Sequence, residues 1–207
     1  ASAIVAGIEV ANQVCELNLT LEQKYTLASR IEGHPDNASA SVCGGLTIGA
    51  SLPNGDLELI HTQDVQAAFA VFIPNVELKT AEARKVLPAQ YDKAYAVHAS
   101  ANANMLTAAL LTKDYKRAGK FMEHDLFHEP FRANLIPNYH EIRQTAKDAG
   151  AYGTAISGAG PTVISLLPIE KVTAFVEKMK PLFPTYNIQA VRVDTKGVQV
   201  EIHETIN

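Results

Sequence analysis

The chain has 207 residues, 47% of them hydrophobic, and a formal net charge of −4. This hydrophobic content is ordinary for a globular protein and argues against disorder or a fibrous repeat. With 18 Lys and Arg residues and no basic block interleaved with aromatics, no nucleic-acid partner is expected. No apolar run reaches the ~20 residues of a membrane-spanning helix. We therefore expect no membrane partner, no signal peptide and a cytoplasmic location.

The two cysteines, Cys15 and Cys43, have no metal-ligand spacing and are too few for a disulfide framework. We expect two buried thiols in a reducing compartment. The chain opens on small and apolar residues that already suggest a helix, at residues 1–7. A helix of this kind packs closely against a neighbour, so we expect the chain to be incomplete at its N-terminus.

The first elements in chain order are two helices, at residues 1–15 and 20–31. Thr20 is the expected N-cap of the second helix, and Gln23 completes a capping-box pattern. Gly33 ends that helix, and a small-residue segment follows the polar residues 32–37. Two strands, 46–52 and 57–61, then flank an Asn-Gly hairpin turn.

After residue 67, short apolar runs alternate with helical patterns. The predicted strands cover residues 68–73, 152–157, 163–167, 188–193 and 197–202. The predicted helices cover residues 80–86, 89–111, 114–122, 137–149 and 169–182, with Pro137 in the first turn of the fourth.

This order predicts an α+β protein with two domains. From residue 68 on, it matches the split βαβ, ferredoxin-like order with an enlarged first connection. Residues 1–65 have too few strands for a complete sheet domain and suggest the later part of one. We therefore expect domains at 1–65 and 66–207, without an internal repeat.

A glycine turn lies between the predicted strands 152–157 and 163–167. Gly158 and Gly160 allow positive φ angles, and successive backbone N–H groups around Ala159 can form a nest for an anion. The alternative is a plain strand-to-strand connection that needs glycine for its geometry. The turn is not a dinucleotide fingerprint, because no helix is predicted directly after it.

A polar segment, Glu-Gly-His-Pro-Asp-Asn, occupies residues 32–37. The segment has two carboxylates, and a carboxylate can hold Mg²⁺ that bridges phosphate oxygens, while His34 and Asn37 can orient a substrate hydroxyl. The alternative is a helix stop followed by a Pro-Asp turn, in which Asp36 and Asn37 only cap backbone groups.

Further candidate anchors are Thr80 and Arg84, four residues apart on one helix face, and Arg132 in a proline-marked loop at 127–132. The planar fork of arginine suits bidentate binding of a carboxylate. The alternative for each arginine is a surface ion pair.

Together these segments resemble the GHMP family of small-molecule kinases. Residues 153–162 resemble the family's third motif, and residues 1–7 resemble the segment directly after its Gly-Leu-Gly-Ser-Ser phosphate loop. The strings at 32–37, 80–88 and 132–139 resemble the branch that acts on homoserine. The resemblance covers essentially the whole chain.

The resemblance implies a GHMP kinase-like architecture, with a partial S5-like N-terminal domain and a ferredoxin-like C-terminal domain. It implies transfer of the ATP γ-phosphoryl group to the side-chain hydroxyl of L-homoserine, on the route to threonine. ATP and Mg²⁺ are the implied cofactors, and we expect a homodimer. Because the phosphate loop itself is not in the sequence, we expect these 207 residues alone to be inactive.

Site residues are implied in the same way. Glu32 would hold Mg²⁺, and Ser2, Gly158, Ala159 and Gly160 would lie near the ATP phosphates. His34, Thr80, Arg84 and Arg132 would line the amino-acid site.

Asn37 matches a position where related mevalonate-type kinases place a catalytic Asp. An amide is a poor proton acceptor, so the resemblance implies catalysis by positioning and charge stabilisation, with Asp36 as a candidate hidden base.

Three alternatives stay open. The first is another GHMP kinase, of mevalonate or shikimate type. The second is a non-catalytic ligand-binding protein on the same scaffold, since fold does not fix function. The third is a folding fragment that exchanges domains in a dimer.

Overall fold

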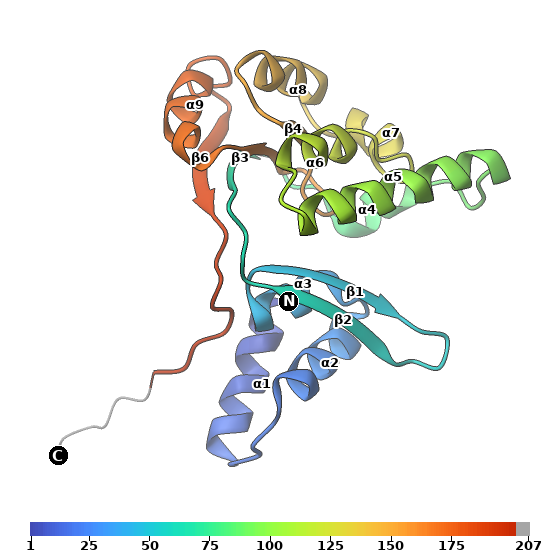
Figure 1. Cartoon of the computed structure of the whole chain (residues 1–207), viewed down its shortest axis with the longest axis vertical. Coiled ribbons are helices and arrows are strands. Elements are labelled where there is room, and N and C mark those ends of the chain that lie inside the picture. The colour runs from blue at the N-terminus through green and yellow to red at the C-terminus, as the bar shows by residue number, and fades with distance from the viewer. Residues whose placement is uncertain (202–207) are drawn as a thin grey trace. The chain divides into compact units, whose positions relative to one another are not determined.

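The computed structural model describes residues 1–201 and divides into two compact units (Figure 1). The first unit contains Ala1–Val65 and the segment that starts at Val193, and the second unit is Gln66–Arg192. The expected second domain ran to residue 207, and this is corrected for residues 193–201. They join the first unit, where the Gly45 N–H donates to the Asp194 carbonyl over 2.6 Å and the Val198 N–H donates to the Val42 carbonyl over 3.2 Å.

Three helices form most of the first unit: α1 (Ser2–Val14), α2 (Leu21–Glu32) and α3 (Asp36–Cys43). The first two are confirmed, and so is the capping box of Thr20 and Gln23. The pattern at 38–45 did not predict α3. An eight-residue helix is marginal by itself. Its buried Ala38 packs in a cluster with residues of α1 and α2, and this contact stabilises it.

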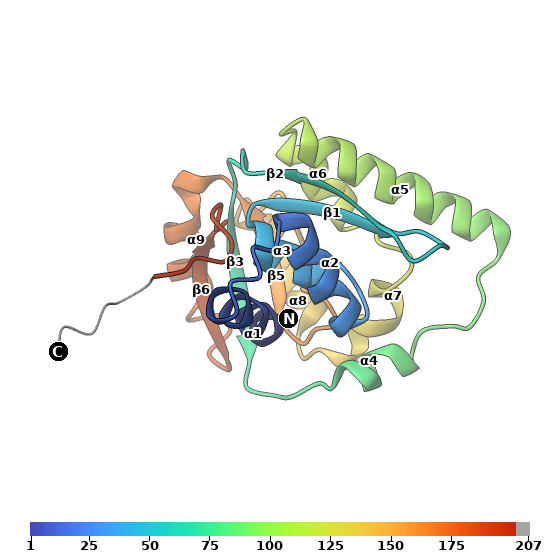
Figure 2. The same ribbon diagram turned by 90° about the horizontal axis from the view of Figure 1, so that it is seen from below.

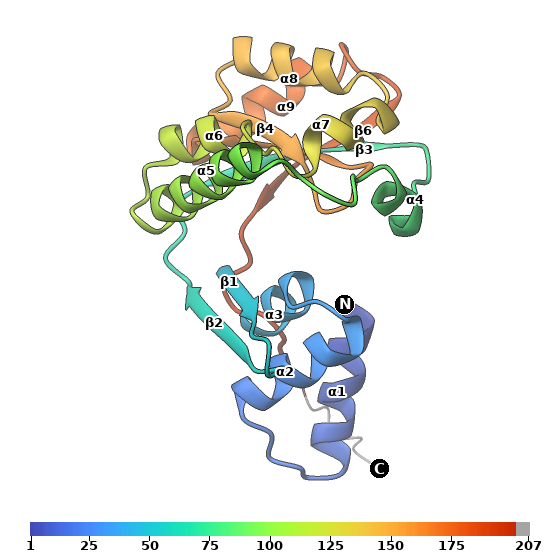
Figure 3. The ribbon, with the colours of Figure 1, turned by 90° about the vertical axis from the view of Figure 1, so that its right-hand side faces the viewer.

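A hairpin completes the first unit. Strands β1 (Leu46–Ser51) and β2 (Leu57–Thr62) pair antiparallel, from Leu46 opposite Thr62 to Ser51 opposite Leu57. The prediction is confirmed, with Gly55 at φ +87° in the turn. Helix α3 contacts both β1 and the helix pair α1–α2 (Figure 3).

The core of the first unit is small. Its buried members are Val5, Ile8, Ala28, Ala38, Val42 and Cys43. Cys15, at the C-cap of α1, is exposed, so the expectation of two buried thiols is wrong for this residue. Burial raises the pKa of the Cys43 thiol.

The predicted strand at 197–202 is wrong for residues 197–201, which form no strand, and Ile202 lies outside the described residues. Gly197 packs directly on the end of α3. A Cβ at this position would lie 2.2 Å from the Val42 carbonyl oxygen. The segment therefore contacts the first unit through close backbone packing.

The second unit contains a four-stranded antiparallel sheet in the order β4-β5-β3-β6. Its strands are β3 (Ala68–Pro74), β4 (Gly153–Ile156), β5 (Val163–Leu167) and β6 (Tyr186–Arg192). Counted in chain order from β3, the four strands lie in the order 2-3-1-4, which is the predicted ferredoxin-like arrangement.

Six α-helices belong to the second unit: α4 (Thr80–Lys85), α5 (Lys93–Leu111), α6 (Tyr115–Met122), α7 (Glu129–Arg132), α8 (Tyr139–Asp148) and α9 (Val172–Met179). Helix α5 starts at Lys93 instead of residue 89, because the Asp92 side chain caps the Ala94 and Tyr95 N–H groups. Pro137 lies before α8 instead of in its first turn, and the expected loop at 127–132 contains α7.

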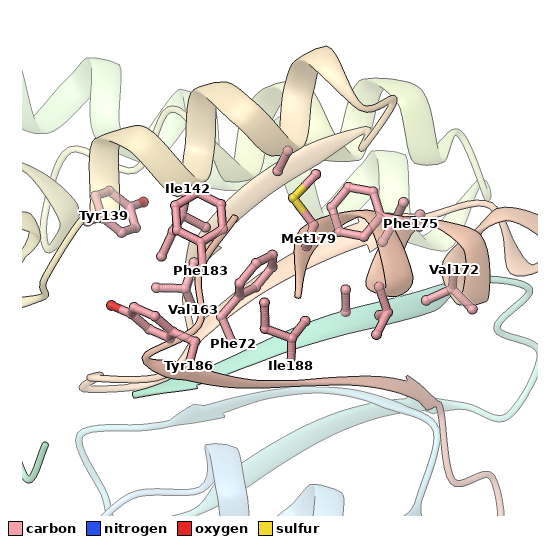
Figure 4. Packing of buried hydrophobic residues seen from close by; sticks show 14 of the residues in the cluster. Phe72, Tyr139, Ile142, Val163, Val172, Phe175, Met179, Phe183, Tyr186 and Ile188 are labelled. Atoms are coloured by element: carbon pink, nitrogen blue, oxygen red, sulfur yellow. The ribbon is translucent and has the colours of Figure 1, made fainter. Parts of the chain in front are cut away.

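Helices α8 and α9 cover one face of the sheet (Figures 3 and 4). Phe72 of β3 is fully buried and meets the rings of Phe175, Phe183 and Tyr186 edge-on, at centroid distances of 6.2–6.5 Å. Helices α5 and α6 pack side by side (Figure 2). Among the helices of residues 1–201, none is long and apolar enough to cross a membrane.

Candidate functional site

The predicted site residues are divided between the two units. Ser2, Glu32, His34 and Asn37 belong to the first unit. Thr80, Arg84, Arg132 and the glycine turn with Gly158, Ala159 and Gly160 belong to the second.

In the first unit, Glu32 ends α2 and faces the start of α1. Its Oε2 lies 3.0 Å from the backbone nitrogen of Ala1, and Ser2 is the first residue of that helix. The Glu32 side chain is 20% exposed, so solvent reaches it. The positive end of the α1 dipole favours anions here. The structure therefore brings Ser2 and Glu32 together at one helix terminus.

No group of three or more metal-ligating side chains occurs within residues 1–201. Mg²⁺ does not need such a group, because proteins commonly bind it through one or two carboxylates plus phosphate oxygens and water. Glu32 is a partly exposed carboxylate at a helix terminus that favours phosphate, so its donor set fits a magnesium ion of this type.

The other polar residues of this segment surround the start of α3. A ring nitrogen of His34 contacts the Asp36 carboxylate, and Asp36 is largely exposed. Asn37 is exposed in the first helical turn, and its carbonyl accepts a hydrogen bond from the Ser41 hydroxyl over 2.8 Å. The pairing leaves one His34 ring nitrogen for a ligand.

In the second unit, Thr80 and Arg84 are both exposed on α4. Arg84 forms no ion pair within the described residues, so its guanidinium group is available for an anion.

Arg132 differs from Arg84 in being only 8% exposed. Its Nε donates to the Ala83 carbonyl over 3.0 Å, and its Nη1 donates to the Gly158 carbonyl over 3.3 Å. The alternative of a surface ion pair does not hold for Arg132. The side chain links α4, α7 and the glycine turn and brings these three parts of the predicted site together.

The glycine turn has the predicted positive φ angles, +60° at Gly158 and +84° at Gly160. The Ser157 N–H donates to the Thr162 carbonyl over 2.9 Å, and the Gly160 N–H donates to the Ser157 carbonyl over 3.0 Å. The N–H groups of Gly158 and Ala159 make no hydrogen bond within the part of the chain that the structure describes. Two successive donors therefore remain for an anion.

The turn borders an open hollow of about 410 Å³. The hollow is lined by residues 73–78, which include the end of β3 and the residues after it, and by Pro161 and Thr162. A small ligand that reached the turn would have room beside it.

The sequence did not predict a set of charged residues next to the turn, in which Glu129 is buried and Glu123 and Arg143 are partly exposed. Glu129 of α7 is 6% exposed; its Oε1 accepts from the Ile156 N–H over 2.8 Å and its Oε2 from Arg143 over 3.2 Å. Glu123 accepts from the Thr154 N–H over 3.1 Å. No local spacing in the sequence links these residues, because they meet only after the chain folds.

Burial raises the pKa of Glu129, although Tyr139, the Ile156 N–H and Arg143 oppose the shift. Burial also raises the pKa of the Tyr139 hydroxyl, which lies beside Glu129.

Asp125 holds the start of α7. Its carboxylate accepts from the N–H groups of Phe127, His128 and Glu129 over 2.9–3.0 Å. Burial by itself raises the pKa of Asp125, but the hydrogen bonds from His128 and the backbone outweigh burial and leave the pKa below its usual value.

Family models match both units. The GHMP kinases N terminal domain matches residues 1–45, and the GHMP kinases C terminal domain matches residues 106–182.

Individual proteins agree with these models. Homoserine kinase of Oceanobacillus iheyensis is 47% identical over 97% of this chain and 69% of its own length. Homoserine kinase of Bacillus cereus is 46% identical over 100% of this chain and 69% of its own length. The chain thus spans about two thirds of the proteins that it matches.

Solved structures also match. A putative homoserine kinase from Listeria monocytogenes superposes with a TM-score of 0.81 and 36% identity, over 93% of this chain and 65% of that chain. Homoserine kinase from Cytophaga hutchinsonii gives a TM-score of 0.82 at 28% identity, over 93% of this chain and 64% of that chain. Mevalonate kinase from L. major, at 21% identity and a TM-score of 0.69, shares the fold over 93% of this chain and 65% of that chain. The chain belongs to the GHMP kinase family, among its homoserine kinases.

Proposed function

We propose that this chain is part of an ATP-dependent kinase that phosphorylates the side-chain hydroxyl of L-homoserine. The observation that carries the proposal is the 45–47% identity to homoserine kinases, which extends over nearly the whole chain. The geometry supports it, because each unit contains donors suited to an anionic ligand.

The first unit supplies the groups for metal and hydroxyl. Glu32 would hold Mg²⁺, and the N-terminal turn of α1 with Ser2 would lie near the ATP phosphates. His34 and Asn37 orient the homoserine hydroxyl. Bound Mg²⁺ would neutralise developing negative charge on the phosphate oxygens.

The second unit supplies the groups for the amino acid and for phosphate. Arg84, with Thr80 beside it on α4, binds the substrate carboxylate through its exposed fork. Arg132 contributes to the same site through the guanidinium N–H groups that do not bond to Ala83 or Gly158. The N–H groups of Gly158 and Ala159 bind a phosphate oxygen.

The chemistry needs little help from a protein base. Phosphoryl transfer is catalysed mainly by positioning and by charge stabilisation. Asn37 cannot take the hydroxyl proton usefully, and Asp36 is paired with His34. We therefore assign Asn37 an orienting role and keep Asp36 as the side chain to test for base catalysis.

The test is ADP release with ATP and L-homoserine, measured on the protein at the length of its relatives and on residues 1–207 alone. We expect activity from the longer form only, with homoserine preferred over mevalonate and shikimate. Preference for either of those would contradict the substrate assignment. Binding without turnover would favour a non-catalytic ligand-binding protein.

Arg84→Ala tests the role of the second unit. Loss of a hydrogen-bonded charge should raise the KM for homoserine by about tenfold or more. Lys85→Ala is the matched control, because Lys85 is the next exposed residue of α4 and lies outside the proposed site. Equal KM values for the two variants would remove Arg84 from the site.

A further inference from the structure

Helix α7 contacts the start of the glycine turn at two points. Glu129 accepts a hydrogen bond from the N–H of Ile156, the last residue of β4. Arg132, three residues later on the same helical turn, donates to the carbonyl of Gly158. The two bonds are two residues apart in the strand and turn, so they fix both the position and the direction of the chain where the turn begins.

Strand β4 is an edge strand, so its outer N–H groups have no neighbouring strand to bond with. Those of Thr154 and Ile156 bond instead to the carboxylates of Glu123 and Glu129. Arg143 of α8 lies close to both, with Nη1 3.2 Å from Glu129 and Nη2 3.6 Å from Glu123. Arg143 thus partly compensates both carboxylates, and the Lys147 Nζ lies 3.8 Å from Glu123 as a second cation.

The Glu129 carboxylate is costly to place here. A buried charge loses its hydration, and only good pairing offsets that loss. A neutral acceptor or a water molecule would satisfy an edge N–H at lower cost. A carboxylate can accept on both oxygens, from Ile156 and from Arg143, and this holds α7, β4 and α8 in one arrangement.

Helix α7 is also held at its start. Asp125 caps three N–H groups there, and the Tyr91 hydroxyl donates to the Phe127 carbonyl over 2.8 Å. With its start fixed, this short helix is held in its orientation by the Glu129 bonds and by the Arg132 bond to Ala83. That orientation sets where Arg132 meets Gly158.

We propose that Glu129 is a positioning residue, which acts through α7 to fix the Arg132 side chain and the free N–H groups of Gly158 and Ala159 in the geometry that an anionic ligand requires. The inference rests on the proposed function for its catalytic consequence. Its structural part concerns the second unit alone.

The test compares Glu129→Gln with Glu123→Gln. Both replaced carboxylates accept from the outer edge of β4 and lie near Arg143, but Glu123 bonds two residues further from the turn. An amide at position 129 has one acceptor oxygen for two donors, so one contact is lost. Both variants should lose similar thermal stability.

Activity should separate them. In the protein at the length of its relatives, Glu129→Gln should lower kcat by about tenfold or more through misplacement of binding groups, with a smaller change in the KM for homoserine. Glu123→Gln should change kcat by less than about twofold. Equal loss of kcat in both variants would overturn the inference, because the effect would then follow stability alone.

Amide hydrogen exchange and NMR chemical shifts test the structural part of the inference, and neither depends on measuring enzyme activity. Glu129→Gln should accelerate exchange at Ile156 and shift the amide resonances of Gly158 and Ala159, while Glu123→Gln should affect Thr154 and leave the turn unchanged. Unchanged turn resonances in Glu129→Gln would overturn the inference. If Glu129→Gln does not fold, Glu129→Asp, which keeps the charge but is one methylene shorter, should give the same pattern. Absence of homoserine phosphorylation by the unsubstituted protein would reject the proposed function, whereas the exchange pattern would still decide the role of Glu129.

Discussion

The two units differ in how they bury apolar surface. In the second unit, large side chains such as Phe72, Tyr139 and Met179 fill the space between a four-stranded sheet and two helices (Figure 4). The first unit has a core of mostly small residues, and its α1–α2 face is hollowed by about 320 Å³.

That hollow is apolar and is lined by Ile4, Gly7, Ile8, Ala11, Leu17, Leu19, Leu27 and Ile31. Several of these residues are well exposed, Ile31 by 58% and Leu17 by 51%. Among the described residues, apolar side chains are therefore packed more completely in the second unit than in the first. The candidate site residues differ in burial between the units in the same way. Arg132, which belongs to the second unit, is the only one of these described residues that is deeply buried.

The largest effect is expected from opening the core of the second unit. Phe72→Ala should lower its free energy of unfolding by about 3–5 kcal/mol, whereas Ile8→Ala should cost the first unit about 2 kcal/mol. Ile8 borders the hollow, so less packing is lost. Urea titration followed by NMR signals from each unit measures both values. Parallel loss of both sets of signals in either variant would mean that the units unfold together, and the comparison would fail.

A medium effect is expected from glycines with positive φ in each unit. Gly33 (φ +87°) has open space around a Cβ, so Gly33→Ala should cost only the backbone strain of about 1 kcal/mol. At Gly160 (φ +84°) a Cβ would lie 3.1 Å from Ile136 and 3.3 Å from Ile156. Crowding should raise the cost of Gly160→Ala to about 2–3 kcal/mol. Thermal unfolding of both variants gives the difference, and equal costs would show that the second unit relaxes around the turn.

The smallest effect is expected from pH. In the first unit, the hydrogen bond from Lys24, with that from Gln13, lowers the pKa of Glu9. A lowered folded-state pKa contributes stability above the unfolded value, ~4.3 for glutamate, and this stability is lost as the pH falls through the folded pKa. In the second unit, the lowered pKa of Asp125 likewise contributes stability that is lost as the pH falls. The raised pKa of Glu129 acts in the opposite direction, because its contribution is lost as the pH rises.

We therefore expect acid to destabilise the first unit more steeply than the second. Glu9→Gln should reduce the loss of unfolding free energy on acidification by less than about 1 kcal/mol, as for ion pairs near the surface. Glu16→Gln, at an exposed residue just after α1, is the control. Chemical denaturation at several pH values measures the slopes. An unchanged slope in Glu9→Gln would assign the acid sensitivity to other groups.

The sequence predicted those helices and turns that a few neighbouring residues specify. The capping box of Thr20 and Gln23 starts α2, and the Asn-Gly turn sets the hairpin register. The glycine turn was predicted with its positive φ angles, since Gly158 and Gly160 are suited to them. The roles of individual site residues stay predictions.

Other features depend on contacts that no short stretch contains. Helix α3 forms because small residues pack on two neighbouring helices, and residues 197–201 lie against α3 through backbone contacts instead of forming a strand. Helix α7 was expected as a loop, because its four residues carry no periodic pattern.

By itself, the sequence determined the fold class, the strand order of the second unit and the resemblance to GHMP kinases, because periodicity, capping and turn residues act over a few positions. Only the tertiary structure decided that Arg132 is buried and bonded to Ala83, 49 residues away, and that Glu129 meets Ile156 and Arg143. Such partners are chosen by how helices pack on the edge of a sheet. The physical reason is that buried charges must find hydrogen-bonding partners wherever the fold places them.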